Sequence, residues 1–348
     1  MSEHGKALQK ATDGGALSPA IEAATKRYRA QARSERTREA YSAAWERFAS
    51  WCGREGRLAL PADVETVAGW MAALADGHDG PVRSASTVNQ YLSAVIHIHR
   101  AAGHSLDRKH PLISETWAGI SRTKAKARPR RHARPLMADD VRSLLEAMRW
   151  QLAADVRDAA LLALGWAGAL RRSELVGLDW IKRGEGDGSI HLEEGLGLVV
   201  TLPTSKGSQD RAVTIEIPRA DAPLTCDAVE RWAKAAGLKA GDPLFCPIDK
   251  GQRLIAGRLT ARSVPRIVKA RVRSLVQVRG KTRQEADELV RQFSGHSMRA
   301  GYATEAGSKD LPSYRIMQHT RHRSHEQVAS YIREGQKWTK SGLKGVGF

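Results

Sequence analysis

The sequence predicts a mainly α protein with two domains: an all-helical N-terminal domain and a mostly helical α+β domain with a small antiparallel sheet. Three observations support this class. The 348 residues suffice for two hydrophobic cores. Apolar residues recur with a helical period along most of the chain. One segment in the C-terminal half changes to a period of two, which is typical of strands.

The helical N-terminal domain is expected over residues 19–120. The preceding residues 1–18 are polar and contain glycines, and we expect a disordered tail there. Within the domain an amphipathic pattern occurs three times, which predicts about four short helices. The segments are TREAYSAAWERFASWCGREG, PADVETVAGWMAALA and SASTVNQYLSAVIHIHRAAG.

A basic linker is expected over residues 121–135. The segment SRTKAKARPRRHARP is rich in Arg, Lys and Pro and has no apolar periodicity. Such a linker would follow a phosphate backbone, with Lys124, Lys126 and Arg130 as candidate contacts. The alternative is a basic tether that does not touch DNA.

The second domain is expected over residues 136–348. It begins with MADDVRSLLEAM, whose acidic first turn suits a helix N-terminus, and continues with the buried helix of VRDAALLALGWAGAL. Two strands flanking the polar segment TSKGSQD predict a β-hairpin. Helical patterns then return and last to the end of the chain.

The charge balance indicates a polyanionic partner. Fifty-six Lys and Arg against 38 Asp and Glu give a net charge of +18, which favours nucleic acid over a merely basic protein. Cys52, Cys226 and Cys246 are too few for a disulfide framework or a cysteine-based zinc site. The longest nearly apolar run and the polar N-terminus predict neither a membrane span nor a signal peptide, so a soluble cytoplasmic protein is expected.

Four places in the second domain combine residues that suit a phosphodiester. Arginine binds phosphate oxygens through a planar fork and stays charged. A lysine can protonate a leaving oxygen, a histidine can accept a proton, and a tyrosine can form a covalent phosphoester. The candidates are Arg171 with the orienting Glu174, Lys206 at the hairpin tip, His296 with Arg299 in SGHSMRAG, and His322 with Tyr331.

Each of these residues taken alone also fits a structural role, as a buried ion pair, a solvated turn or a core side chain. Tyr302 has apolar neighbours and is expected to pack rather than react. The series His319, His322 and His325 would suggest a metal, but its spacing turns the three rings around a helix and no acidic or cysteine partner lies close. No metal is therefore predicted.

Together, these residues resemble the tyrosine recombinases of the phage integrase family over roughly residues 34–348. Arg171 and Glu174 match the family's Arg-x-x-Glu, Lys206 its hairpin lysine, and His296 with Arg299 its His-x-x-Arg. His322 matches the later His/Trp position, and Tyr331 in YIRE the nucleophile. The chain departs from the family around Gln318 and HTRHRS, where the usual Leu-Gly-His is missing.

The resemblance implies a C-shaped clamp around duplex DNA, formed by a SAM-like core-binding domain and the catalytic domain. It places Thr37 and Arg38, and Thr87 and Gln90, near the major groove. Arg262 is expected to read a base, and a plain phosphate contact is the alternative.

The resemblance also implies the reaction. Tyr331 forms a 3′-phosphotyrosyl link while Arg171, Arg299 and His322 hold the phosphate. Lys206 protonates the 5′-oxygen, and His296 assists Tyr331. Neither ATP, a metal nor another cofactor is required.

Four protomers would join two inverted-repeat sites through a Holliday junction, and the tail 332–348 would dock on a neighbour through Trp338, Leu343 and Phe348. A type IB topoisomerase and an inactive DNA-binding regulator are the alternatives.

Overall fold

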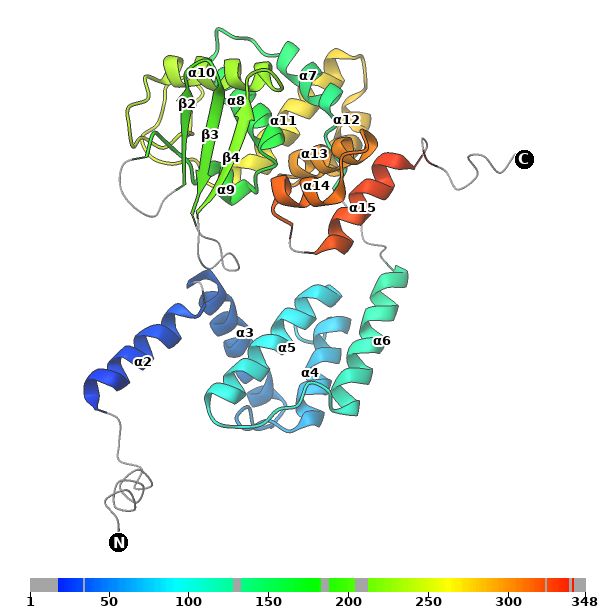
Figure 1. The fold of residues 1–348 in the computed structure, drawn as a ribbon. Coiled ribbons are helices and arrows are strands. Elements are labelled where there is room, and N and C mark those ends of the chain that lie inside the picture. The colour runs from blue at the N-terminus through cyan, green and yellow to red at the C-terminus, as the bar shows by residue number, and fades with distance from the viewer. Residues whose placement is uncertain are drawn as a thin grey trace. The chain divides into compact units, whose positions relative to one another are not determined.

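The computed structural model describes residues 18–33, 35–127, 133–182, 188–203, 212–322, 324–337 and 340. The chain divides into two compact units, Met1–Arg130 and Arg131–Phe348 (Figure 1). Each unit has its own hydrophobic core. The predicted tail of residues 1–17 lies outside the described residues.

The described part of the N-terminal unit is entirely helical, as the apolar periodicity predicts. Two helices begin at side-chain caps: Asp63 accepts from Thr66 N–H at 2.6 Å, and Ser84 accepts from Thr87 N–H at 3.2 Å. The helices are α2 (Pro19–Gln31), α3 (Glu35–Arg54), α4 (Val64–Asp76), α5 (Ala85–Ala101) and α6 (Pro111–Ala127).

The core of this unit is built from the stripes that the sequence indicates. Phe48, Trp70, Leu74 and Leu92 are buried between α3, α4 and α5. Aromatic contacts tie the helices, since the rings of Phe48 and Trp70 lie 4.9 Å apart. The side of each helix that carries these residues is therefore fixed by packing.

Helix α6 corrects the expected start of the linker at residue 121. The helix continues to Ala127, because SRTKAKA consists largely of good helix formers and its lysines lie in the last turn, where the helix dipole favours cations. Ile120 and Trp117 pack against the core and tie the preceding turns to the unit. The loss of apolar periodicity after residue 120 was therefore not sufficient to locate the end of this helix.

The C-terminal unit combines helices with a sheet, as expected. Its helices are α7 (Ala138–Glu146), α8 (Ala153–Ala167), α9 (Arg172–Val176), α10 (Pro223–Ala236), α11 (Ser263–Val278), α12 (Arg283–Arg291), α13 (Ser297–Ser308), α14 (Ser313–Thr320) and α15 (His325–Gln336). Its strands are β1 (Asp179–Trp180), β2 (Ser189–Glu193), β3 (Gly197–Leu202) and β4 (Val213–Pro218).

The sheet is mixed rather than antiparallel throughout. The predicted hairpin is confirmed as the antiparallel pair β3 and β4, which pairs Val200 with Ile215. Strand β2 adds to it in antiparallel orientation, and the two-residue β1 pairs with β2 in parallel, in the order β1-β2-β3-β4 (Figure 1). The sequence analysis missed β1 and β2 because both are short.

Helix α8 lies at the centre of this unit. Leu161, Leu162 and Leu164 are fully buried, as expected for a segment that is apolar nearly all round. The sheet and α10 belong to the same core, which also reaches α11 and α13. Helix α8 ends at Ala167, and the following turn leads directly to Arg171.

In the described part of the chain, no helix is long and apolar enough to cross a membrane.

Candidate active site

The turn between α8 and α9 presents Arg171. Arg171 is the N-cap of α9, and its N–H donates to Glu174 Oε2 at 2.8 Å. Its Nη1 forms an ion pair with Glu174 Oε1 at 2.5 Å. The three-residue offset therefore selects Arg171 rather than Arg172, because Glu174 binds both its backbone and its guanidinium.

Helix α13 presents His296 and Arg299. His296 is its N-cap and is exposed, whereas Arg299 is 1% exposed. Nη1 of Arg299 donates to the Ala169 carbonyl at 2.8 Å, and its Nη2 is buried without a hydrogen-bond partner among the described residues. A buried guanidinium with one open donor is suited to an anion.

Helix α15 brings Tyr331 to His296. Their side chains are joined by a 2.8 Å hydrogen bond between Tyr331 Oη and His296 Nε2. The Tyr331 ring centroid lies 6.4 Å from that of His296 and 5.7 Å from that of His322. Burial raises the pKa of Tyr331, although the charge of Arg299 opposes the shift. The phenol is thus protonated at neutral pH, and its oxygen lies within hydrogen-bonding distance of an imidazole nitrogen.

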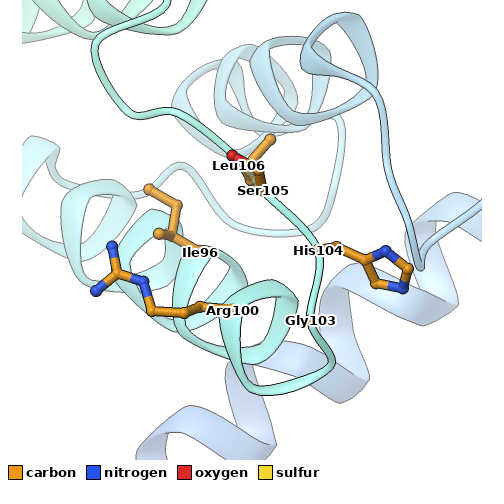
Figure 2. Close-up of a pocket in the computed structure, with 6 residues that line it drawn as sticks. All are labelled: Ile96, Arg100, Gly103, His104, Ser105 and Leu106. Carbon is orange, nitrogen blue, oxygen red and sulfur yellow. The ribbon is translucent and has the colours of Figure 1, made fainter. Parts of the chain in front are cut away.

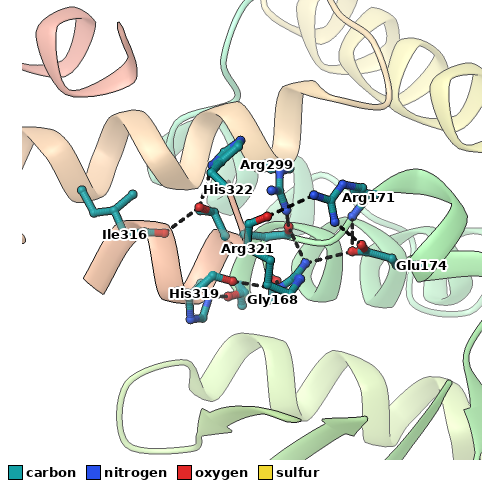
Figure 3. Close-up of polar contacts among 11 residues, drawn as sticks. Gly168, Arg171, Glu174, Arg299, Ile316, His319, Arg321 and His322 are labelled. Carbon is teal, nitrogen blue, oxygen red and sulfur yellow. Dashed lines mark hydrogen bonds and ion pairs between the residues drawn. The ribbon is translucent and has the colours of Figure 1, made fainter. Parts of the chain in front are cut away.

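A threonine fixes the tautomer of His322. Thr320 Oγ1 donates its only proton to the Ile316 carbonyl at 2.6 Å (Figure 3). The contact of 2.7 Å between Thr320 Oγ1 and His322 Nδ1 must then be donated by His322. Neutral His322 therefore carries its proton on Nδ1 and a lone pair on Nε2.

Arg321 is the residue that the sequence analysis missed. Figure 3 shows its guanidinium among Gly168, Glu174 and His319. Nη2 of Arg321 contacts Glu174 Oε2 at 2.9 Å, so one carboxylate binds both Arg171 and Arg321. The HTRHRS departure from the family pattern was noted, but it gave no reason to assign Arg321 a place in the site.

The site is strongly electropositive. The carboxylate of Glu174 pairs with the guanidiniums of Arg171 and Arg321, and the charges of all three groups act on the buried Arg299. Burial lowers the pKa of Arg299 to about 9, aided by the charges of Arg171 and Arg321. Burial would raise the pKa of Glu174, but the charge of Arg321 and the bonds from Arg171 lower it below its usual value. An entering phosphate would relieve the repulsion among the cations.

The same field acts on His322. Burial lowers its pKa to about 4, together with the charges of Arg299, His296, Arg171 and Arg321. His322 is therefore neutral at pH 7 while the site holds no anion. An anion beside the ring would raise this pKa.

The remaining tyrosine and histidine candidates have separate partners. Tyr302 stacks on His319 with ring centroids 4.3 Å apart, in agreement with the predicted packing role. His319 Nε2 contacts the Ala167 carbonyl and His325 Nε2 contacts Ser313. No group of side chains suited to a metal occurs among the residues described.

Two predicted site residues, Lys206 and Arg130, lie outside the described residues. Lys124 is half-buried on α6, and its ammonium donates to the Ala75 carbonyl at the end of α4. This intramolecular bond distinguishes it from Lys126, which is exposed on the same helix.

The candidate base contacts lie near helix N-termini. Thr37 and Arg38 are in the first turn of α3, and Thr87 and Gln90 lie near the start of α5. Arg262 is exposed and is the N-cap of α11.

The N-terminal unit contains a pocket of about 290 Å³ that includes none of the predicted site residues. Its lining residues are Ile96, Arg100, Gly103, His104, Ser105 and Leu106. Figure 2 shows that the side chains of Arg100 and His104 extend in different directions. The pocket therefore does not gather its basic side chains around one point.

Comparison with known proteins agrees with this arrangement. The profile of the phage integrase family matches residues 134–337. An integrase/recombinase XerD homologue of Selenomonas ruminantium is 31% identical over 330 residues, covering 91% of this chain and 87% of its own. The recombinase Cre of Escherichia phage P1 is 26% identical over 316 residues, covering 87% and 85%.

Solved structures share the fold. A λ integrase dimer bound to a COC′ core site superposes with a TM-score of 0.52 at 15% identity, covering 94% of this chain and 99% of that one. XerH bound to palindromic difH in a post-cleavage complex gives a TM-score of 0.50 at 18% identity, covering 82% and 71%. The chain belongs to the phage integrase family of tyrosine recombinases.

Proposed function

We propose that Tyr331 is the nucleophile with which this site-specific recombinase cuts DNA. The observation that carries the proposal is the 2.8 Å bond from Tyr331 Oη to His296 Nε2, one helical turn from the buried Arg299. A phenol needs a base or a positive field to attack at neutral pH, and this site supplies both.

The chemical step conserves one phosphodiester bond. Tyr331 Oη attacks the scissile phosphorus while His296 accepts the phenolic proton. A bond forms between phosphorus and the tyrosine oxygen, and the bond to the 5′-oxygen breaks. We assign Lys206 to protonate that oxygen, on the strength of its match to the family's hairpin lysine. Attack by the 5′-hydroxyl of a partner strand reverses the step, so no ATP is consumed.

Three side chains are suited to the non-bridging oxygens. Arg299 has an open Nη2 donor, and the side chain of Arg171 is 43% exposed. His322 completes the set when its Nε2 is protonated. Donors that are in place before the reaction stabilise the extra charge of the pentavalent transition state without reorganisation.

The expected substrate is double-stranded DNA that carries inverted-repeat sites. The relatives support this, since XerH was solved on a palindromic difH substrate and λ integrase on a core site. The charge of +18 suits such a partner. Thr37, Arg38, Thr87, Gln90, Arg262 and Lys126 stay candidate DNA contacts, and a tetramer on two sites is the proposed active assembly.

The proposal is tested with nicked suicide DNA carrying candidate sites, incubated with wild type and with Tyr331→Phe and separated on a denaturing gel. We expect a slow-migrating covalent protein–DNA adduct with the wild type alone, and equal DNA binding by both proteins. An adduct with Tyr331→Phe would move the nucleophile to another residue, with Tyr302 or Tyr314 tested next.

Two further outcomes distinguish the alternatives. Binding without an adduct in either protein would indicate an inactive regulator. An adduct whose strands never join to a different duplex, together with relaxation of supercoiled DNA, would indicate a topoisomerase.

A further inference from the structure

We propose that Arg321 is a positioning residue that fixes the orientation of Arg171 and joins the segment carrying His322 to the turn between α8 and α9. This inference rests on the proposed function, because it assigns Arg321 a role in the same DNA-cleaving site. It also gives a role to the segment in which the chain departs from the family's Leu-Gly-His pattern.

The backbone of Arg321 adopts an unusual conformation. Its φ of 56° and ψ of 43° place it in the left-handed region, at the C-cap of α14. Glycine is the residue that adopts this region without steric cost. In this conformation the Arg321 carbonyl accepts a hydrogen bond from Arg171 Nη2 at 3.1 Å. The backbone of residue 321 therefore contributes one of the contacts that orient Arg171.

The side chain of Arg321 explains why an arginine is present. The side chain is 11% exposed, and its guanidinium makes four polar contacts. Nη1 donates to the carbonyls of Gly168 at 3.2 Å and His319 at 2.7 Å. Nη2 donates to the Ala169 carbonyl at 3.1 Å and to Glu174 Oε2 at 2.9 Å (Figure 3). One planar group thus joins α14 to the turn that precedes Arg171.

Two acceptors of Arg321 are shared with the phosphate-binding arginines. The Ala169 carbonyl accepts from Arg321 and from Arg299, and Ala169 is itself left-handed, with a φ of 44°. Glu174 Oε2 accepts from Arg321 and from the Arg171 N–H. Arg321 therefore shares an acceptor with the guanidinium of Arg299 and a carboxylate with Arg171, and removing it would leave each of these acceptors with one donor fewer.

Arg321 also changes the charge of the site. With Arg171 alone, Glu174 would form a neutral pair. Arg321 adds a second cation to the same carboxylate. The single negative charge of Glu174 therefore offsets only part of the positive charge of the two arginines, and the remainder can attract a phosphate. Lysine could not reproduce this arrangement, because a single ammonium lacks the planar fork that reaches carbonyls and carboxylate at once.

The first experiment compares single-turnover cleavage of nicked suicide DNA by the wild type, Arg321→Gly, Arg321→Lys and Arg315→Ala. Glycine is compatible with the left-handed backbone and removes the whole arginine side chain with its guanidinium. We expect Arg321→Gly to bind DNA with unchanged affinity and to cleave about 10²-fold more slowly, the cost of a small misplacement of catalytic groups. Arg321→Lys should be intermediate, and Arg315→Ala, on exposed α14 surface, should cleave like the wild type.

A double-mutant cycle distinguishes positioning from general stability. If Arg321 acts by orienting the Arg171 guanidinium, it should contribute little to cleavage once Arg171→Lys has removed that guanidinium. Adding Arg321→Gly should then slow cleavage by less than about threefold, whereas independent effects would multiply. Added guanidinium ion should partly restore cleavage by Arg321→Gly, which a merely misfolded protein would not show.

Each outcome decides between the interpretations. A wild-type rate in Arg321→Gly, or a full multiplicative loss in the double variant, would overturn the role of Arg321 and leave the proposed function intact. If Arg321→Gly fails to fold, the folded Arg321→Lys must show the same non-additivity with Arg171→Lys, or the inference is wrong. A wild type that forms no adduct contradicts the proposed function and this inference with it.

Discussion

His322 must gain a proton before it can donate a hydrogen bond to a phosphate oxygen. Thr320 holds its Nδ1 proton, so Nε2 has a lone pair in the neutral ring. Its pKa of about 4, lowered by burial and by the surrounding arginines, keeps it neutral at pH 7. A scissile phosphate reverses this balance, because its negative charge offsets the arginines and favours the imidazolium.

Cleavage should therefore show a pH dependence that belongs to His322. As pH rises through the pKa of His322 in the DNA complex, the imidazolium loses its Nε2 proton and cleavage slows. In His322→Trp the indole N–H donates at every pH and does not titrate. Single-turnover cleavage measured from about pH 5.5 to about pH 9 should give a wild-type to His322→Trp rate ratio that falls with pH. A constant ratio would exclude proton uptake at His322.

Arg299 illustrates the cost of preparing an anion site in advance. A guanidinium that is 1% exposed loses hydration, and only Ala169 O replaces it among the described residues. Its pKa of about 9 records that penalty, together with repulsion from Arg171 and Arg321. In the proposed function a DNA phosphate supplies the partner that Nη2 of Arg299 lacks among the described residues, so phosphate binding would offset this penalty.

At the scale of elements, glycines bring Tyr331 to the site. Helices α13 and α15 approach each other closely at two points. A Cβ on Gly307 of α13 would lie 2.8 Å from the Ile332 Cα of α15, and a Cβ on Gly335 of α15 would overlap the Thr304 carbonyl of α13. Because His296 begins α13 and Tyr331 lies on α15, the spacing of the helices sets the distance between the proposed base and the proposed nucleophile.

Substitution of either glycine should separate the two helices. Gly307→Ala and Gly335→Ala should each destabilise the protein by about 1–3 kcal/mol through overpacking. Each should slow cleavage by about 10-fold or more, because Tyr331 moves away from His296. Thermal unfolding and single-turnover cleavage measure the two effects.

Gly119→Ala serves as the matched control. Gly119 is an exposed helical glycine, and a Cβ added to it would meet no other atom within 4 Å. Alanine should therefore stabilise the protein by about 0.5–1 kcal/mol and leave cleavage unchanged. Wild-type cleavage in both Gly307→Ala and Gly335→Ala would show that helix spacing does not limit the reaction.

At the scale of the whole molecule, the charge of +18 should dominate DNA affinity. Basic side chains that neutralise phosphates release counterions, so affinity falls steeply with salt. We expect a loss of about 10³-fold or more between about 50 and about 200 mM salt, measured by fluorescence anisotropy. A DNA affinity that hardly changes with salt concentration would contradict an interface made largely of contacts to DNA phosphates.

Two lysines on α6 allow the salt dependence to be tested with a matched control. Lys126→Ala and Lys124→Ala remove the same charge from the same helix. Lys126 is exposed, so its loss should reduce the salt slope by about one. Lys124 donates to Ala75, so its loss should change the slope less. Equal slopes for the two variants would show that the bond to Ala75 opens when DNA binds. Enclosure of DNA by both units as a clamp stays a prediction.

The mainly helical class, the hairpin and the set of candidate residues follow from local information in the sequence. Periodicity fixes which helix face is buried, and a three-residue offset is enough to pair Arg171 with Glu174. The chemistry of lysine and tyrosine suggested a proton donor at Lys206 and a nucleophile at Tyr331. The resemblance to a family added the phosphate-holding role expected of His322.

The hydrogen bonds between segments that are far apart in the sequence follow only from the tertiary structure. The Arg321 guanidinium bonds carbonyls about 150 positions away in the chain, and the tautomer of His322 depends on which group accepts the Thr320 proton. Strand β2 forms by pairing with β3, and the two-residue β1 forms by pairing with β2. Helix α6 persists because its first turns pack on a core. Such contacts depend on packing between segments, which local periodicity does not encode.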